Sequence, residues 1–325
     1  THCISSAASD VYKRQILDDY VPAGRFWVRS PRAGEFRVGD NVVVYRPSTR
    51  EWISDLKMDQ IPPRADGLPI TQWEPGRFDT YAERVITLIK GDTLHFENPV
   101  VMSLDRKYGG GRVLRYSYAD RIEECGVENL RFDSDYTGPE DENHGWNAVA
   151  VKVAAHCWVR NVTSLHFGMG LVTMDQYAKN ISVLDCTCLE PVSTLAGSRR
   201  YSFHISQGQL CLVKDCTSED ARHDYATGSL NCGPNVFTSC RAKRPHADIG
   251  PHQRWNTGTL YDCVISDGEI CVQDRSNYGS GQGWAAGNNV LWNCSGSTVI
   301  VQSPWVSAYN LSLIHISEPT RHLRI

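Results

Sequence analysis

Short apolar runs, rich in β-branched residues, recur along the chain from about residue 125 at a nearly constant spacing. Each run ends on an apolar or cysteine residue that directly follows a polar one. Successive runs lie 23 to 32 residues apart, a spacing typical of solenoid proteins, in which each repeat packs on the one before it. The runs end at Leu130, Val162, Cys186, Cys216, Cys240, Cys263 and Cys294.

Strand-rich repeats with few helix signals predict an all-β chain whose main body, residues 125–310, is a right-handed parallel β-helix. In such a solenoid, the last residue of each run stacks on its equivalent in the next coil. Because five successive positions are cysteine, we expect a column of thiols that behave as small buried hydrophobic groups. The chain has 12 cysteines but no CxxC pair, which does not favour a structural metal site.

Residues 16–124 follow a different pattern, and we assign them to an N-terminal β-rich region together with the first coils. Residues 21–31, 36–47, 84–100 and 112–118 alternate apolar with polar positions or are β-branched, as strands do. Residues 50–76 are polar and contain prolines and tryptophans. They indicate a long insertion or small subdomain, which we expect near the first coils.

The two ends of the chain resemble translated sequencing-adapter DNA. The resemblance lies in DVYKRQ at residues 10–15 and in LSLIHISEPTR at residues 311–321. We therefore expect residues 1–15 and 311–325 to be artefact, and residues 16–310 to be an internal fragment of a longer protein. A signal peptide could then lie upstream.

The coil motif gives residues 125–310 a family resemblance. Runs of the form Asn-Val/Ile-x-x-x-Asp/Asn-Cys, and the opening Gly-Val-Glu-Asn-Leu at 126–130, resemble the pectate-lyase-like parallel β-helix superfamily. That group contains polysaccharide lyases, glycoside hydrolases, epimerases and phage tailspikes, so the resemblance implies a carbohydrate-related role without fixing the reaction. The paired aspartates, Gly-His-Gly and Arg-Ile-Lys of polygalacturonases are absent, so the chain looks like a separate branch.

Charge and hydropathy narrow the possible partners. A net charge of −4 and a pI of about 6.2 do not favour nucleic-acid binding. No run of 18 apolar residues occurs, so no membrane span is predicted. We expect a polysaccharide partner and therefore a secreted, periplasmic or cell-surface location.

Four successive coils carry polar, aromatic-bearing segments between their apolar runs, at residues 198–209, 220–229, 246–258 and 273–288. Asp224 and Asp248 follow their anchor cysteines at equal distances, which predicts side chains about 4.8 Å apart on adjacent coils. Counted back from the next anchors, His204, His252 and Gln282 fall at similar positions. The pattern predicts a strip of His, Asp and Arg side chains on one outer face.

The residue types in this strip suggest their roles. Histidine is the natural base near neutral pH, arginine binds carboxylates through two parallel hydrogen bonds, and paired aspartates suit Ca²⁺. Our catalytic candidates are His223, His252, Asp224, Asp248 and Arg254, and Ca²⁺ at Asp224 and Asp248 is the one cofactor considered. Our substrate-binding candidates are Arg222, His204, Tyr201, Arg275, Asp274, Gln282, Trp255 and Trp284.

Some of these candidates have equally reasonable structural roles. Trp255 and Trp284 could shield the edge of the solenoid instead of stacking on sugar rings, and Arg200 could be a surface charge. The repeated ionisable groups at 222–224 and 248–254 are harder to explain by packing alone.

Three functions fit the strip. β-Elimination on a uronate polymer needs cations around the carboxylate and a base for the α-proton, here His223 or His252, and the excess of His and Arg favours this lyase chemistry. A glycoside hydrolase would use a carboxylate pair, Asp224 with Asp248 or Asp248 with Asp274. The third alternative is a non-catalytic carbohydrate-binding or tailspike-like adhesin.

Overall fold

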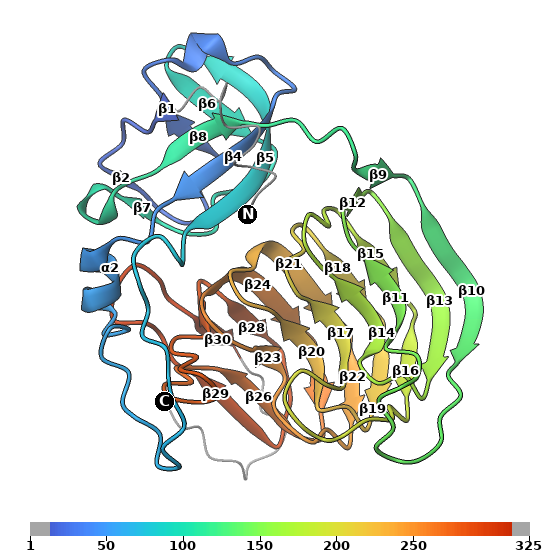
Figure 1. Cartoon of the computed structure of the whole chain (residues 1–325). Coiled ribbons are helices and arrows are strands. Elements are labelled where there is room, and N and C mark those ends of the chain that lie inside the picture. The colour runs from blue at the N-terminus through green and yellow to red at the C-terminus, as the bar shows by residue number, and fades with distance from the viewer. Residues whose placement is uncertain (1–13, 314–325) are drawn as a thin grey trace.

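The computed structural model describes residues 14–313, which form an N-terminal antiparallel β unit and a long solenoid that lie side by side (Figure 1). The predicted all-β, right-handed parallel β-helix is confirmed. Residues 1–13 and 314–325, which make up most of the two adapter-like ends, lie outside the described residues. Of those ends, β1 (Arg14–Gln15) pairs with β8, and β30 (Leu311–Leu313) pairs with β28.

The largest sheet runs the length of the solenoid, and all of its strands are parallel. The N-terminal unit contributes no strand to it. In the first coils, β13 is one continuous strand that pairs with two short strands of the next coil. The sheet contains β10 (Gly126–Asp133), β13 (Trp158–Leu165), β15 (Ser182–Leu184), β16 (Thr187–Leu189), β18 (Leu212–Lys214), β19 (Thr217–Glu219), β21 (Cys232–Thr238), β22 (Arg241–Lys243), β24 (Asn256–Asp262), β25 (Ile265–Ser266), β27 (Ala286–Gly287), β28 (Val290–Trp292) and β30.

A second parallel sheet forms the face that carries the candidate site. Its inner surface stacks aromatic side chains, with the rings of Phe203 and Tyr225 5.4 Å apart. A bridge between Ile249 and Ile270 continues this face into the last coils. The strands are β11 (Asn147–Val151), β14 (Gly170–Met174), β17 (Tyr201–Ile205), β20 (His223–Thr227) and β23 (Gly250–Pro251), followed in the last coils by β26 (Glu269–Val272) paired with β29 (Thr298–Val301). A separate two-stranded sheet pairs β9 (Ile122–Glu123) with β12 (Ala154–Ala155) at the first coil.

A column of buried cysteines lies inside the solenoid, as the repeat predicts. Cys186, Cys216, Cys240 and Cys294 are each at most 1% exposed. Each thiol donates to a backbone carbonyl of the preceding coil, as Cys294 does to Tyr261 at 3.2 Å. Burial raises the pKa of Cys294 to about 11, which keeps its thiol protonated and unreactive.

Two anchor positions differ from the prediction. Asp262 pairs with Trp292, and the inward position two residues further on is Val264, which is fully buried; Cys263 therefore does not belong to the column. Leu130 has the predicted register but remains 48% exposed, because it lies in the first coil with no described coil beyond it.

The residue before each inward-facing anchor position turns the chain from one face to the next. These residues have φ between 51° and 56°, a left-handed conformation that Asn and Asp tolerate because their short side chains bond locally. On adjacent coils, the Asn161 amide donates to the Asn129 carbonyl oxygen at 2.8 Å. The turning residues are Asn129, Asn161, Asp185, Asp215, Ser239, Cys263 and Asn293.

The N-terminal unit is a sheet with strand order β1-β8-β4-β5-β6-β3. Its strands lie in the segments where the alternating pattern predicts them. They are β3 (Trp27–Arg29), β4 (Asn41–Arg46), β5 (Thr80–Lys90), β6 (Thr93–Phe96) and β8 (Arg112–Arg115), joined by a small pair, β2 (Tyr20–Val21) and β7 (Leu104–Asp105), by the 3-10 turns η2 (Ala33–Glu35) and η3 (Arg106–Tyr108), and by helix α2 (Arg50–Asp55).

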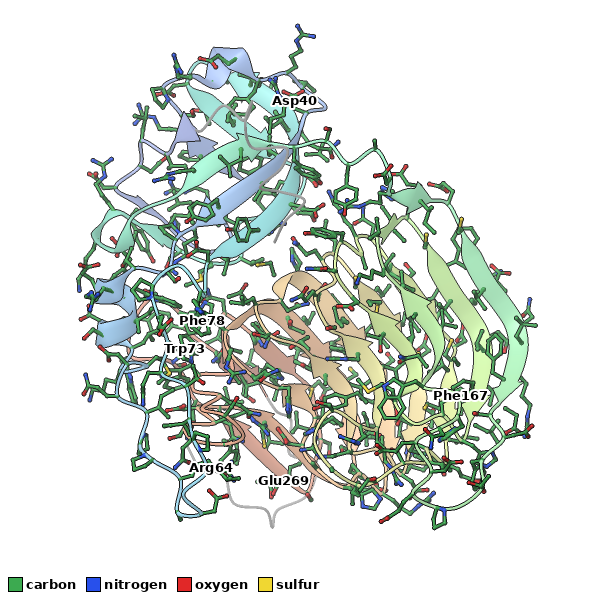
Figure 2. The ribbon with its side chains drawn as sticks, viewed as in Figure 1. Asp40, Arg64, Trp73, Phe78, Phe167 and Glu269 are labelled. Atoms are coloured by element: carbon green, nitrogen blue, oxygen red, sulfur yellow. The ribbon has the colours of Figure 1, made fainter. Side chains whose placement is uncertain are left out.

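The insertion that begins with α2 packs on the last coils of the solenoid, so the prediction that it lies near the first coils is wrong. Trp52 and Trp73 meet Trp255 at ring separations of 4.9 and 6.4 Å, and Trp284 belongs to the same buried cluster. Figure 2 shows Trp73 and Phe78 beside these coils. Tryptophans from distant parts of the chain pack together here. The repeat spacing describes the solenoid alone, so it could not predict where the insertion packs.

Polar contacts extend this seam beyond the tryptophans. The Thr71 amide donates to the Ser280 carbonyl at 2.9 Å, and the Arg64 guanidinium donates to the Gly279 carbonyl at 2.7 Å. The insertion is therefore fixed against the loop at residues 277–280, and it brings Arg64 to the face of the solenoid.

Candidate functional site

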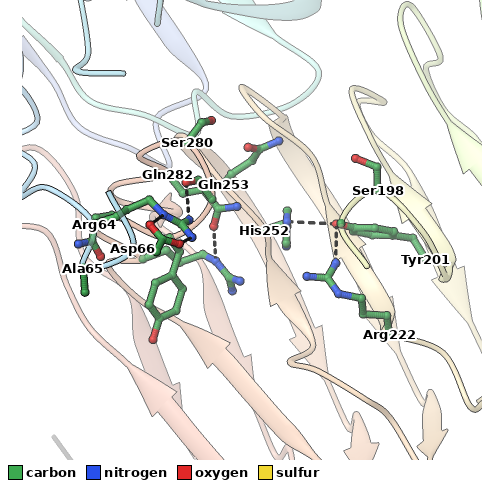
Figure 3. A pocket seen from close by; sticks show the side chains of 15 residues that line it. Arg64, Ala65, Asp66, Ser198, Tyr201, Arg222, His252, Gln253, Ser280 and Gln282 are labelled. Carbon is green, nitrogen blue, oxygen red and sulfur yellow. Dashed lines mark hydrogen bonds and ion pairs between the residues drawn. The ribbon is translucent and has the colours of Figure 1, made fainter. Parts of the chain in front are cut away.

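A cavity of about 740 Å³ lies where the insertion meets the coils that carry β17, β20 and β23 (Figure 3). We name it the arginine pocket because Arg64, Arg222 and Arg275 are in its wall. The insertion contributes residues 64–66, and the solenoid contributes Gly197, Ser198, Tyr201, Arg222, His252, Gln253, Arg275, residues 277–280 and Gln282.

Strand register gathers one tyrosine and three histidines at this pocket. Tyr201 on β17 pairs with His223 on β20, and their rings lie 4.9 Å apart. His252, just after β23, is 4.5 Å from the ring of His223 and 5.4 Å from that of Tyr201. His204, also on β17, is 4.9 Å from Tyr201. The predicted strip is thus compact here, and all four candidates are in one cluster.

Tyr201 connects an arginine to a histidine. Its hydroxyl oxygen accepts a hydrogen bond from Arg222 Nη1 at 3.3 Å and lies 3.1 Å from His252 Nε2 (Figure 3). The hydroxyl can accept from Arg222 and at the same time donate its own hydrogen to His252 Nε2. The His252 hydrogen then lies on Nδ1, which is buried and has no partner among the described residues.

His223 lies beneath this group, 1% exposed. Its Nδ1 is 2.6 Å from the backbone carbonyl of Asp248, which can only accept, so Nδ1 carries the hydrogen. The other nitrogen, Nε2, is left as a buried lone pair with no partner within residues 14–313.

All three histidines are neutral because they are buried. Burial lowers the pKa of His204 and of His223 to about 4, and that of His252 to about 2. The positive charges of Arg222 and Arg275 lower the pKa of His252 further. An anionic ligand in the pocket would act in the opposite direction and raise these pKa values.

Asp248 and Gln282 both hold Arg275. The Asp248 carboxylate accepts from Arg275 Nη1, and its other oxygen lies 3.6 Å from His223 Nδ1. Gln282 Oε1 accepts from Arg275 Nε at 2.7 Å. Arg222 differs from Arg275, because within residues 14–313 it forms no ion pair and its guanidinium is half-buried at the pocket wall.

Asp224 does not join Asp248. Its side chain is fully buried inside the solenoid, both of its oxygens lack a hydrogen-bond partner among the described residues, and burial raises its pKa to about 7. The prediction that Asp224 and Asp248 lie side by side and share a Ca²⁺ ion is therefore wrong. The Asp224 carboxylate faces the interior, whereas the Asp248 carboxylate holds Arg275. Asp224 and the next residue, Tyr225, are both 0% exposed, so the simple alternation of inward and outward side chains does not hold at this point of β20.

Four other candidates lie outside the pocket. Arg254 donates to Ser280 at the rim, and Asp274 accepts from the Ser276 amide at 2.8 Å within its own turn. Trp255 and Trp284 are 0% and 2% exposed in the seam with the insertion, and so cannot stack on a sugar. Of the two roles that the sequence leaves open for these tryptophans, the structural one holds.

Sequence reasoning missed the part of the pocket that the insertion and the 277–280 loop supply. Arg64 and Asp66 form an ion pair at its edge, and Tyr278 and Ser280 complete the wall. The high polarity of residues 50–76 was the only available signal, and it gave no position relative to the coils.

Within residues 14–313, no group of three or more His, Cys, Asp and Glu side chains is arranged to hold a metal ion. The same residues include no helix long and apolar enough to cross a membrane.

No family model and no curated protein matches the chain. Several solved structures resemble it at low identity. The tailspike gp49 of Pseudomonas phage LKA1 is 9% identical, with 87% of this chain and 46% of that chain covered and a TM-score of 0.35. The tailspike gp61 of Pseudomonas phage phi297 is 10% identical, with 95% and 58% covered and a TM-score of 0.34.

A third structure is the Gp54 tailspike of Acinetobacter baumannii bacteriophage AP22 in complex with A. baumannii capsular saccharide, 7% identical, with 90% and 57% covered and a TM-score of 0.34. The chain spans about half the length of these proteins. Such identities concern the fold alone, so the function must be argued from the residues of this chain.

Proposed function

We propose that the protein binds an acidic polysaccharide in the arginine pocket and cleaves it by β-elimination. The observation that carries this proposal is the half-buried Arg222, free of any carboxylate among the described residues, beside the Tyr201–His252 pair. A cation without an anion next to a proton-transfer pair is the minimum set that this reaction needs.

Arg222 would bind the uronate carboxylate. A guanidinium and a carboxylate form two parallel hydrogen bonds. Arg222 donates one side-chain hydrogen bond, to Tyr201, so its other N–H groups can bind the carboxylate. Neutralising the carboxylate makes the proton on the α-carbon more acidic. Arg64 stands across the pocket but is already paired with Asp66, so it would make a smaller contribution.

Tyr201 and His252 would move the protons. The Tyr201 hydrogen passes to His252 Nε2 as the tyrosine oxygen takes the α-proton of the sugar. The C–H electron pair forms the new double bond, and the β-C–O bond breaks with its electrons on the leaving oxygen. That oxygen then takes a proton back from Tyr201, and His252 returns its proton to Tyr201. An anionic sugar favours the first transfer because it raises the pKa of His252.

The carboxylates fit hydrolysis less well. A glycoside hydrolase needs two carboxyl groups that face one glycosidic bond. Asp224 faces the interior, and the Asp248 carboxylate is held by Arg275. A secreted, periplasmic or cell-surface location is part of the same proposal, because polymeric acidic glycans occur there.

The proposal is tested with a panel of acidic and neutral polysaccharides, with calcium and with a chelator. We expect reducing ends together with the ultraviolet absorbance of unsaturated ends, on acidic polymers only, and no effect of the chelator. Reducing ends without that absorbance would indicate a hydrolase. Binding without any product would indicate an adhesin.

Arg222→Met provides the residue-level test. Losing a carboxylate contact in the pocket should lower kcat/KM about 100-fold. Arg241→Met is the matched control, because Arg241 is exposed on β22 outside the pocket, and it should leave kcat/KM unchanged. Equal rates for the two variants would remove Arg222 from the mechanism.

A further inference from the structure

A second cavity, of about 540 Å³, is lined by residues of the solenoid. Residues 137–141, in the loop between β10 and β11, form one side of it, and Ser193, Leu195 and Arg200 form the other. We name it the acidic pocket because Glu140 and Asp141 are in its wall.

One segment of chain separates the two cavities. Ser198 and Tyr201 line the arginine pocket, whereas Leu195 and Arg200 line the acidic pocket. Arg200 and Tyr201 are consecutive, and the Arg200 carbonyl accepts from the Arg222 amide at 2.9 Å. A polymer that leaves the arginine pocket across this segment therefore enters the acidic pocket.

The two cavities have opposite charge. The wall of the arginine pocket has three arginines and one aspartate. The wall of the acidic pocket has two carboxylates and one arginine. Adjacent sites of opposite sign select ligands whose neighbouring units differ in charge, because like charges placed opposite each other are penalised.

The two carboxylates of the acidic pocket differ in their partners. Asp141 accepts from the backbone of Thr137 and Asn143, and these bonds lower its pKa. Glu140 makes no hydrogen bond or ion pair with another residue of the described range. Arg200 donates to the Ser193 carbonyl at 2.5 Å, so it is committed to its own loop. A carboxylate on a sugar would face net negative charge here, while sugar hydroxyls would find free acceptors and the exposed face of Leu195.

We propose that the acidic pocket is a second sugar subsite that takes an uncharged or amino sugar, so that the preferred substrate alternates uronate with non-uronate units. This inference rests on the proposed function, since the arginine pocket must take the uronate. It excludes homopolyuronates as the best ligands.

The test measures binding, not cleavage, by electrophoresis in gels that contain the polymer, with Tyr201→Phe as the background so that the polymer stays intact. The probes are two homopolyuronates, polygalacturonate and alginate, and two alternating polymers, hyaluronan and unsulfated chondroitin. We expect an alternating polymer to bind best. Glu140→Lys should shift the preference about fivefold toward the homopolyuronates, the effect of an exposed ion pair.

Glu51→Lys is the control, an exposed glutamate on α2 outside both pockets, and it should leave the preference unchanged. A homopolyuronate that binds best, or a preference that Glu140→Lys does not move, would overturn the subsite while the proposed function stands. Binding to none of the four, or binding that Arg222→Met leaves unchanged, would overturn both.

Discussion

Burial sets the protonation of the residues in the arginine pocket. His204, His223 and His252 lie so close together that one proton among them would be poorly solvated and next to Arg222 and Arg275. The cluster is therefore neutral when empty. A substrate carboxylate would change this balance, so ligand charge and proton transfer are coupled in the pocket.

This neutrality predicts an unusual pH profile. Since the pKa of His252 is about 2 in the free protein, kcat/KM should show no inflection near pH 6.5, the ordinary value for histidine. The profile should stay flat from about pH 8 down to about pH 5. An inflection near pH 6.5 that disappears in His252→Gln would show that the histidine is charged in the free protein.

Asp224 predicts a pH effect on stability. Its folded-state pKa, about 7, lies above the ordinary 3.8, so the folded protein keeps this proton where the unfolded chain releases it. The contribution of Asp224 to the free energy of unfolding therefore falls as pH rises from about 4 to about 7, by up to about 4 kcal/mol. In chemical denaturation, the free energy of unfolding of Asp224→Asn should rise relative to that of the unchanged protein as pH increases between those values.

The control for this experiment is Asp135→Asn, an exposed aspartate, whose difference from the unchanged protein should not depend on pH. A constant difference for Asp224→Asn as well would mean that Asp224 is ionised in the folded protein.

Register counting from the sequence placed His252 and Gln282 at the pocket wall but failed for Asp224. The count gives the level of a residue along the strand. It does not give the direction of the side chain: Asp224 and Tyr225 are consecutive and both fully buried, which no residue type signals.

At the scale of single elements, the left-handed turn between strands is the repeated feature of each coil. Cys263 occupies this position with φ of 52°, where other coils have Asn, Asp or Ser. The Asn293 amide reaches its sulfur at 3.4 Å, in place of the oxygen that Asn129 offers to Asn161.

Cys263→Asn should therefore stabilise the protein by about 1 kcal/mol, since Asn accepts this conformation more readily and restores the side-chain ladder. Asn161→Cys, the reverse change at an equivalent turn with φ of 51°, should destabilise it by a similar amount. Denaturant midpoints measure both. Shifts in the same direction would show that turn conformation does not decide the outcome.

The repeat spacing predicted the strands and the thiol column because the residues that face the interior recur once per coil and are apolar. The error at Cys263 arose because Cys263 and Val264 are both apolar and adjacent. Only strand register, fixed by the pair Asp262–Trp292, shows which of them faces inward.

At the scale of the whole molecule, the tryptophan seam joins the N-terminal unit to the last coils and brings Arg64 to the pocket. The sequence could mark residues 50–76 as an insertion, but its docking position depends on surface match between Trp52, Trp73 and Trp255. Such a match arises between segments that are about 200 residues apart in sequence, beyond the reach of local pattern.

Trp255→Ala should cost about 3–5 kcal/mol in the free energy of unfolding, the usual effect of emptying a buried tryptophan site. Trp292→Ala, at a tryptophan that is 47% exposed, should cost far less. Equal losses in urea denaturation would mean that the seam contributes little to holding the two units together.

Chemical reduction of the substrate tests whether the arginine pocket recognises and activates a uronate carboxylate. One acidic polysaccharide and its carboxyl-reduced form are offered to the unchanged protein, and unsaturated ends are read by absorbance. We expect product from the acidic form and none from the reduced form. Cleavage of both forms at similar rates would contradict it, because the reaction would then not depend on the carboxylate that Arg222 is proposed to hold.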